Sequence, residues 1–493
     1  MAIPKICGIE TEYGILTRGP DLNPVNGSSI LINAYVNGQS RRIGWDYMHE
    51  RPGHDARGWG VDYTAPEMDY HLVNTVLTNG ARYYVDHAHP EISTPECRTA
   101  IETLVYDRAA EEIVRLSMEA LGNVLSPDQE IILYKNNSDG KGNSYGCHEN
   151  YLVDRSYPFG RLASLITSHF VTRQVYTGAG KVGCEAPDSE PDSVAFQISQ
   201  RADFFEEEIG LETTLKRPIV NTRDEPHCDP QKYRRLHVIV GDANMSETAT
   251  YLKVGCTAII LSMIEDEALI DPVIVSKPVP AMRQVSYDLT LSSLLQLQDG
   301  RKMSALDIQW SFLESAQEYQ QSHGLESVGI SDGEQILDIW ERTLDGLSRD
   351  PFSLAPTIDW VAKKRLIDGF ADRHGLGTSD PRLKAIDLQY SDMRPDKGLA
   401  SKAGLVRIVD EETVRLAIEN PPESTRAYFR GQCLKKWPES IAAANWDSMV
   451  FDIGDEPLKR VEMNEPLKGT KELVGNIIDD AQSPRDLLRM LSG

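Results

Sequence analysis

Two acidic residues near the start of the chain have the type and spacing of metal ligands. They are Glu10 and Glu12, in a strand-like run over residues 6–15. Side chains alternate between the two faces of a strand, so both carboxylates share one face, about 7 Å apart. Carboxylates at this spacing repel each other unless a cation or an arginine lies between them, and hard divalent cations prefer oxygen ligands. The alternative interpretation of this pair is a solvent-facing edge.

A second strand-like segment carries further candidate groups. Alternation places Arg82, Tyr84 and Asp86 on one face. An arginine suited to phosphate, a phenol and a carboxylate on one face indicate a site rather than a solvent edge. The acids of both segments favour magnesium over zinc. We interpret the histidines that follow, His87 and His89, as structural or substrate-facing.

A third polar segment runs from Asn136 to Tyr151, where alternation puts His148 and Asn150 on one face. So dense a polar run must line a cavity or face water. Cations within residues 221–237 could meet phosphates, although charge runs are usually solvated.

Other catalytic motifs are excluded. The run Gly178-Ala179-Gly180-Lys181 resembles part of a P-loop, but Val182 follows where Ser or Thr is needed, so we interpret it as a turn. No Cys/His pairing is identifiable in the sequence.

Charge and composition limit the classes of protein to which the chain can belong. The chain has 493 residues, with 51 lysines and arginines against 75 acids and a formal net charge of −24. This sign repels phosphate backbones and argues against a nucleic-acid partner. Neither a membrane-spanning run nor a signal region is recognisable, and the seven scattered cysteines indicate buried thiols. We therefore expect a cytoplasmic protein without a membrane partner.

The elements expected to position these residues are mostly strands. The long irregular stretch over 17–77 predicts a mobile, functional loop. A capping box over 93–96 predicts the start of a helix that closes at Gly122. Further strands are expected at 81–86, 130–136, 145–153, 218–222, 235–240 and 448–453, with helices at 247–264 and within 305–372, and a boundary at Pro421-Pro422.

Taken together, the motifs resemble the Pup ligase and depupylase family, which shares the carboxylate–amine ligase fold of glutamine synthetase. The resemblance covers nearly the whole chain and rests on the segments 8–14, 79–91, 135–150, 221–227 and 236–247. Asp86 is followed by His-Ala-His-Pro-Glu, one residue shorter than the ligase pattern. An insert with Trp45-Asp46-Tyr47 and residues 55–58 resembles the depupylase active-site loop. Both features place the chain with the deamidase and depupylase branch.

The resemblance implies an α+β fold: a curved, mostly antiparallel sheet backed by helices, forming a glutamine synthetase-like cradle. It implies a catalytic domain over 1–422, with a mobile insert at about 38–77, and a small C-terminal domain over 423–493.

The resemblance also implies roles for individual residues. Asp86 would be the catalytic carboxylate, either as nucleophile or as general base. Mg²⁺ would be held by Glu10, Tyr84 and Glu91, with Glu12 a further candidate. ATP would contact Arg82, Thr94 and Trp446, and its phosphates would face Arg201, Arg223 and Arg430. A helix-capping role would explain Thr94 equally well.

The implied function is a hydrolase that acts on the prokaryotic ubiquitin-like protein Pup. It would deamidate the C-terminal glutamine of Pup and cleave the isopeptide bond between Pup and substrate lysines, with ATP and Mg²⁺ as cofactors. Its partners would be Pup and pupylated proteins, with the proteasomal ATPase ring as a further one. The alternatives are a Pup–protein ligase of the same family and a non-catalytic, nucleotide-binding Pup adaptor.

Overall fold

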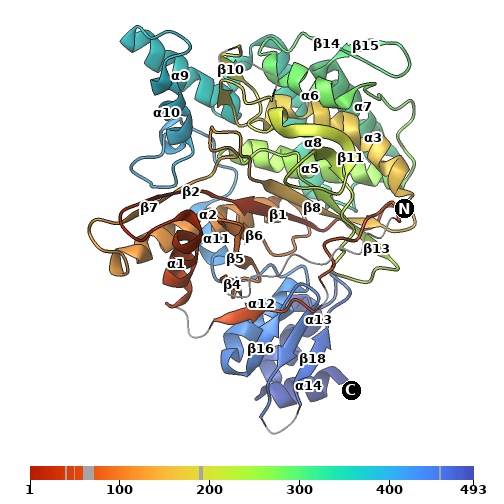
Figure 1. Cartoon of the computed structure of the whole chain (residues 1–493). Coiled ribbons are helices and arrows are strands. Elements are labelled where there is room, and N and C mark those ends of the chain that lie inside the picture. The colour runs from red at the N-terminus through yellow and green to blue at the C-terminus, as the bar shows by residue number, and fades with distance from the viewer. Residues whose placement is uncertain (39–41, 49, 59–71, 188–192, 455–456, 493) are drawn as a thin grey trace.

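A single curved sheet crosses the middle of the molecule and organises everything around it (Figure 1). The computed structural model describes residues 1–38, 42–48, 50–58, 72–187, 193–454 and 457–492. The sheet has ten strands, in the order β13 (Tyr233–Val238), β8 (Cys147–Asp154), β1 (Cys7–Glu12), β6 (His89–Ser93), β5 (Arg82–Asp86), β4 (Asn74–Val76), β3 (Ile43–Trp45), β16 (Ile441–Ala444), β17 (Ser448–Phe451) and β18 (Lys459–Glu462).

All neighbouring strands of this sheet are antiparallel except β3 and β16, which run parallel. Four two-stranded sheets pair β2 (Gly14–Arg18) with β7 (Glu130–Tyr134), β9 (Lys181–Val182) with β10 (Phe196–Gln197), β11 (Phe205–Gly210) with β12 (Arg217–Asn221), and β14 (Leu294–Gln296) with β15 (Lys302–Ser304).

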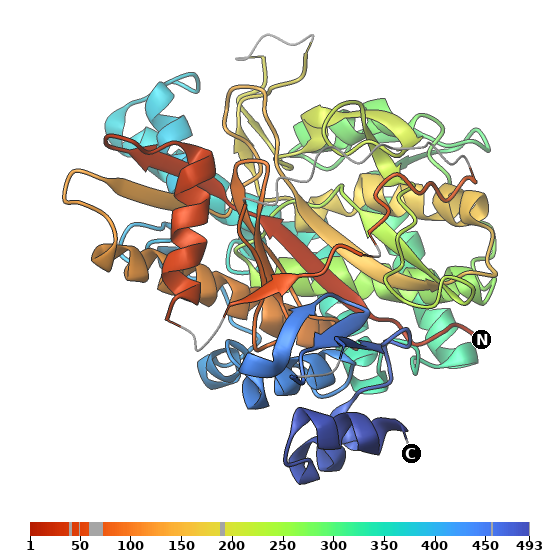
Figure 2. The ribbon, with the colours of Figure 1, turned by 60° about the horizontal axis from the view of Figure 1, so that its bottom comes forward.

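Helices cover the convex side of the sheet and build the upper lobe (Figures 1 and 2). Helix α1 packs on β5 and β6, while α2 and α5 pack on each other and on β1 and β8. None of the helices in the described ranges is long and apolar enough to span a membrane. The helices are α1 (Pro24–Val36), α2 (Ala100–Ala120), α3 (Phe159–Thr172), α4 (Gln174–Thr177), α5 (Glu247–Glu265), α6 (Pro278–Tyr287), α7 (Ala305–His323), α8 (Ile330–Arg349), α9 (Asp359–His374), α10 (Pro381–Tyr390), α11 (Glu411–Ala417), α12 (Ala427–Lys436), α13 (Lys471–Asp480) and α14 (Pro484–Ser492).

The two faces of the sheet follow the alternation expected from the sequence. Ile9, Tyr83, Tyr151 and Val238 are buried against the helices. Their immediate neighbours along each strand point to the opposite, concave face, which carries the polar residues. The predicted α+β class, with a curved and mostly antiparallel sheet backed by helices, is confirmed.

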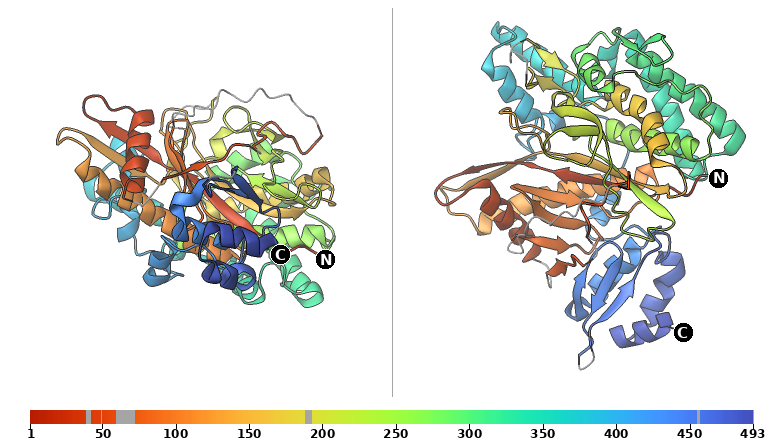
Figure 3. Two further views of the ribbon diagram at one scale, coloured as in Figure 1. Left: turned by 90° about the horizontal axis from the view of Figure 1, so that it is seen from below. Right: turned by 45° about the vertical axis from the view of Figure 1, so that its right-hand side comes forward.

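The C-terminal unit continues the main sheet instead of standing apart from it. Strand β3, from the predicted insert, pairs with β16, so the sheet runs from the catalytic part into the C-terminal strands (Figure 3). Ile43 and Trp45 of β3 pack in one cluster with Phe429, Met449 and Phe451. The boundary predicted at residue 422 stays a prediction.

Two expectations about local structure are wrong. Helix α1 forms inside the stretch expected to be irregular, because Asn23 caps it in a capping box with Asn26. Strands β3 and β4 also lie within the insert, while residues 59–71 of that insert lie outside the described residues. The predicted capping box at 93–96 is not a helix start: Ser93 ends β6, and Thr99 caps α2. Pairing of β6 with β1 keeps the backbone extended there.

A buried ion cluster ties the C-terminal unit to the sheet. Glu96 binds the guanidinium groups of Arg430 and, at 2.8 Å, Arg426, both of which are almost fully buried. Arg430 also donates to the carbonyl oxygens of Gly80 (3.0 Å) and Trp446 (3.1 Å). Burial would raise the pKa of Glu96, but the two arginines outweigh burial and lower it to about 2.

We expect Glu96→Gln to lower the free energy of unfolding by about 3 kcal/mol, because it leaves two buried guanidinium groups without a counter-charge. Urea denaturation followed by circular dichroism measures this change. The matched control is Glu462→Gln, an exposed acid on β18 that should shift stability by less than about 0.5 kcal/mol.

The same pair of proteins gives a pH test. The folded pKa of Glu96 lies below its unfolded value. The stability that its charge contributes is therefore complete above about pH 4.5 and is lost as the pH falls toward about 2. The stability gap between wild type and Glu96→Gln should therefore narrow over this range. A stability difference that does not change with pH would contradict the role of Glu96 as the charged partner of the two arginines.

Candidate active site

One row of side chains crosses three neighbouring strands on the concave face. The register places Glu12 of β1 opposite Glu91 of β6, and Glu91 opposite Tyr84 of β5. Opposite residues of an antiparallel pair point to the same face, with Cβ atoms about 4.5–5.5 Å apart. The structure therefore brings these three predicted metal ligands together.

Asp86 joins this row from the end of β5. Carboxyl oxygens of Glu12, Asp86 and Glu91 all lie within 4.8 Å of one another. Three converging carboxylates offer an all-oxygen ligand set, which suits Mg²⁺. The side chain predicted to be catalytic thus borders a position that could hold a divalent cation.

The crowding of these acids changes their pKa values. Burial and the carboxylates of Asp86 and Glu12 raise the pKa of Glu91 well above its ordinary value. Burial alone would also raise the pKa of Glu12. The contact from His89 (Nδ1–Oε2, 3.5 Å) and the charges of neighbouring histidines outweigh burial, so the pKa of Glu12 is lowered to about 2. Burial beside two other acids therefore disfavours the charged form of Glu91, and a bound cation would favour it.

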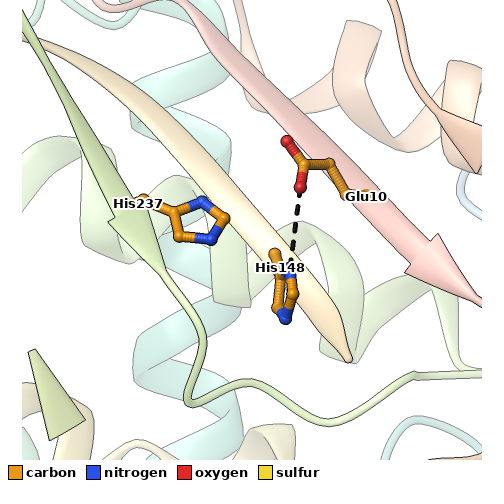
Figure 4. Close-up of side chains that lie close together, drawn as sticks. All are labelled: Glu10, His148 and His237. Carbon is orange, nitrogen blue, oxygen red and sulfur yellow. Dashed lines mark ion pairs between the residues drawn. The ribbon is translucent and has the colours of Figure 1, made fainter. Parts of the chain in front are cut away.

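A second cluster lies beside the first, toward β13. Glu10 of β1, His148 of β8 and His237 of β13 converge from three adjacent strands (Figure 4). One ligand atom of each lies within 4.8 Å of the others. Burial would raise the pKa of Glu10, but the contact from His148 (Nδ1–Oε2, 3.5 Å) and the charge of Arg235 help to lower it well below its ordinary value. Two imidazoles and a carboxylate could hold a second divalent cation.

Asn150 determines which nitrogen of His237 is free to bind a cation. Arg235 donates to Asn150 Oδ1 at 2.9 Å, and Asn150 Nδ2 donates to Glu10 Oε1 at 2.9 Å, so Oδ1 accepts from the imidazole. His237 Nδ1–H donates to that oxygen at 3.1 Å, which leaves the lone pair on Nε2. This nitrogen is buried without a hydrogen-bond partner among the described residues, as expected of a ligand. Burial and Arg235 lower the pKa of His237 well below its usual range, so the ring is neutral.

A cleft opens beside Glu10, between the sheet and the C-terminal unit. Its lining includes Thr94, Trp446, Arg235 and Arg426. Thr94 Oγ1 accepts a hydrogen bond from the Ile9 N–H at 3.0 Å, so the helix-capping alternative for this residue is wrong. A partly apolar cleft with a few convergent polar groups is typical of a site for a small organic ligand such as a nucleotide.

Arg82 of β5 pairs with Ser93, which lines the cleft, and lies two residues before Tyr84. Its guanidinium carbon is 4.1 Å from the centre of the Trp45 ring and 4.0 Å from that of Tyr84. The Trp45 ring in turn meets Trp446 edge-on, with centroids 5.2 Å apart. Arg82 Nε donates to Asn74 Oδ1 at 3.0 Å. These contacts hold the guanidinium on the concave face.

The three arginines predicted to face phosphates occupy different environments. Arg201 is buried and donates to Ser144 Oγ at 3.3 Å; burial and Arg217 lower its pKa to about 10, partly offset by Glu12. Arg223 Nε is buried without a hydrogen-bond partner in the described ranges. Arg430 is committed to Glu96, as described above. The ATP contacts predicted for all three stay predictions.

Some neighbours of the site were not among the predicted site residues. His148, His237, Asn150 and Arg235 all contact Glu10 or one another. Alternation indicated that His148 and Asn150 share a face, but only the strand order places β8 and β13 beside β1. The first part of the insert also reaches this region, since Ala56 donates its N–H to the Thr222 carbonyl at 2.8 Å.

Comparison with known proteins agrees with this geometry. The sequence model of the Pup-ligase protein family matches residues 5–450. The chain is 48% identical to a depupylase of Acidothermus cellulolyticus and 43% identical to a Pup deamidase/depupylase of Mycolicibacterium smegmatis. Each alignment covers 99% of both chains.

Two solved structures share the fold. The complex between the prokaryotic ubiquitin-like protein Pup and its ligase PafA has a TM-score of 0.80 and 32% identity, covering 99% of this chain and 95% of that one. The Pup ligase PafA in complex with ADP has a TM-score of 0.74 and 36% identity, covering 83% of this chain and 90% of that one.

We expect Glu91→Gln to stabilise the protein in EDTA, because it removes a carboxyl buried among like charges. The same change should reduce the rise in melting temperature that MgCl₂ causes in the wild type, while the separate Glu10–His148–His237 cluster is untouched. Thermal unfolding with EDTA and with increasing MgCl₂ measures both effects. The control Glu119→Gln, an exposed acid on α2, should keep the wild-type response. An unchanged magnesium response in Glu91→Gln would rule this carboxylate out as a ligand.

Proposed function

The chain belongs to the Pup-ligase protein family, and from this premise we propose that it is a hydrolase that deamidates Pup and removes it from tagged proteins. The observation that carries the proposal is the similarity to a depupylase and a Pup deamidase/depupylase, at 43–48% identity over 99% of each chain. The ligase structures are less similar, at 32–36% identity. Asp86, which we propose to be catalytic, lies in the carboxylate cluster as this chemistry needs.

The proposed reaction joins water to an amide carbonyl. Asp86 acts either as the nucleophile, forming an anhydride that water then opens, or as the base that takes a proton from the attacking water. In both cases the carbon–nitrogen bond breaks, and the amine leaves with a proton as ammonia or as the lysine side chain. Asp86 is 41% exposed, so the carbonyl of a large substrate can reach it.

The residues present fit both proposed cofactors. Glu12 and Glu91, with Tyr84 beside them, would hold Mg²⁺, and Glu10 would hold a second cation with His148 and His237. Thr94 and Trp446 in the cleft, with Arg82 nearby, would contact ATP, and Arg201 and Arg223 would approach its phosphates. When bound, the cation and the phosphates supply charge that stabilises the developing oxyanion. Hydrolysis is downhill, so the reaction itself does not require ATP to be consumed.

The ligase alternative uses the same carboxylates and the same cleft but needs ATP as a substrate. The adaptor alternative would not require a complete acid cluster, whereas Glu12, Asp86 and Glu91 converge and Glu10 lies with His148 and His237 in a second cluster. We propose Pup and pupylated proteins as the partners, with the proteasomal ATPase ring as a further one.

The decisive experiment uses Pup ending in glutamine, with Mg²⁺ and ATP, and measures ammonia and ADP together. We expect ammonia release without stoichiometric ADP. A Pup-linked protein incubated in parallel should release free Pup. Pup ending in glutamate, incubated in parallel with a lysine-bearing protein, Mg²⁺ and ATP, tests the ligase: stoichiometric ADP with transfer of this Pup to lysine would establish it. Binding of both forms of Pup without turnover would establish the adaptor.

We expect Asp86→Asn to lose both activities by at least about a hundredfold, because the amide can serve neither as nucleophile nor as base. Nucleotide affinity, measured by isothermal titration calorimetry, should stay close to that of the wild type. The control Asp480→Asn, an exposed residue at the end of α13, should keep full activity. Near-normal turnover by Asp86→Asn would refute the catalytic assignment.

A further inference from the structure

His87 contacts the Asp86 carboxylate from the solvent side of the acid cluster. Its Nδ1 lies 3.0 Å from Asp86 Oδ2, and within the described part of the chain this is the one hydrogen bond that the carboxylate receives. A carboxylate only accepts hydrogen bonds, so Nδ1 carries the hydrogen and donates it. The direction of the Asp86 side chain therefore depends on its immediate neighbour in the sequence.

The other close neighbours of Asp86 repel it. Glu12 and Glu91 each bring a carboxyl oxygen within 4.8 Å of it. The side chain is 41% exposed, so tight packing does not hold it against this repulsion. Without a donor on its outer side, the carboxylate would turn toward solvent and away from a carbonyl bound at the cluster.

The backbone at His87 does not explain why histidine occupies this position. His87 has φ +52°, in the left-handed region, at the turn of the hairpin that joins β5 to β6. Glycine adopts this conformation without steric cost, whereas a residue with a Cβ is strained. The ring is 68% exposed, so burial in a core does not explain it either. The hydrogen bond to Asp86 is therefore the interaction that the His87 side chain provides and that glycine at this turn would lack.

We propose that His87 is a positioning residue, whose Nδ1–H holds the Asp86 carboxylate in the direction needed for attack on the amide carbonyl. This inference rests on the proposed hydrolase function. It concerns the rate of the chemical step, because His87 acts through Asp86 and not through the bound substrate.

The test compares two replacements that both suit the left-handed turn. His87→Gly removes the donor and relieves the backbone, while His87→Asn tolerates the turn and keeps a short amide donor. Ammonia release from Pup ending in glutamine, with Mg²⁺ and ATP, gives kcat and KM, and thermal unfolding reports on folding. His374→Asn, an exposed histidine at the end of α9, is the control and should match the wild type.

We expect His87→Gly to lower kcat about tenfold, equal to about 1.4 kcal/mol in the barrier, with KM changed less than about twofold. Its melting temperature should equal or exceed that of the wild type, since glycine relieves the strained turn. His87→Asn should recover most of kcat. A merely structural role would instead lower stability and would not produce this rescue.

Two results would overturn the inference alone: a glycine variant with wild-type kcat, or equal losses in the glycine and asparagine variants. Both require an active wild type. A wild type that releases no ammonia would overturn this inference and the proposed function together, so the two failures are distinguishable.

Discussion

The structure depends on one constraint: acids that repel each other must be held together on one face of a sheet. Glu12, Asp86 and Glu91 approach within 4.8 Å, a distance at which like charges are costly unless something offsets them. Contacts from His87 to Asp86 and from His89 to Glu12 offset part of this repulsion, while burial and the carboxylates of Asp86 and Glu12 raise the pKa of Glu91. The remaining excess of negative charge is what makes a divalent cation a fitting ligand.

The helices and the C-terminal unit stabilise this arrangement. The faces of β1, β5 and β8 that carry Ile9, Tyr83 and Tyr151 are buried under α1, α2 and α5, and this fixes the strand register. A slip of one residue would turn every acid into the helices. On the other side, Glu96 and its two arginines hold Trp446 over the cleft, so the proposed nucleotide position is shared by two parts of the chain that are distant in sequence.

Sequence reasoning could predict the face of each side chain but not the neighbour of each strand. Period-two alternation grouped Glu10 with Glu12 and Arg82 with Asp86, because it depends only on local geometry. The cluster of Glu10 with His148 and His237 depends on β1, β8 and β13 lying side by side, which pairing across the chain decides. The capping box at 93–96 failed for the same reason, since cross-strand pairing overrode a local helix signal.

The positions of the two clusters indicate how two ligands could meet at one centre. The cleft beside Glu10 is bounded by the C-terminal unit. Asp86 belongs to the other cluster, with Glu12 and Glu91, and its side chain is 41% exposed at the hairpin between β5 and β6. On the proposed function, the nucleotide would enter from the first side and the amide carbonyl from the second, with Glu10 and Glu12 between them. Since Glu10 and Glu12 are two residues apart on one strand, a single rigid element would set the distance between nucleotide and carbonyl.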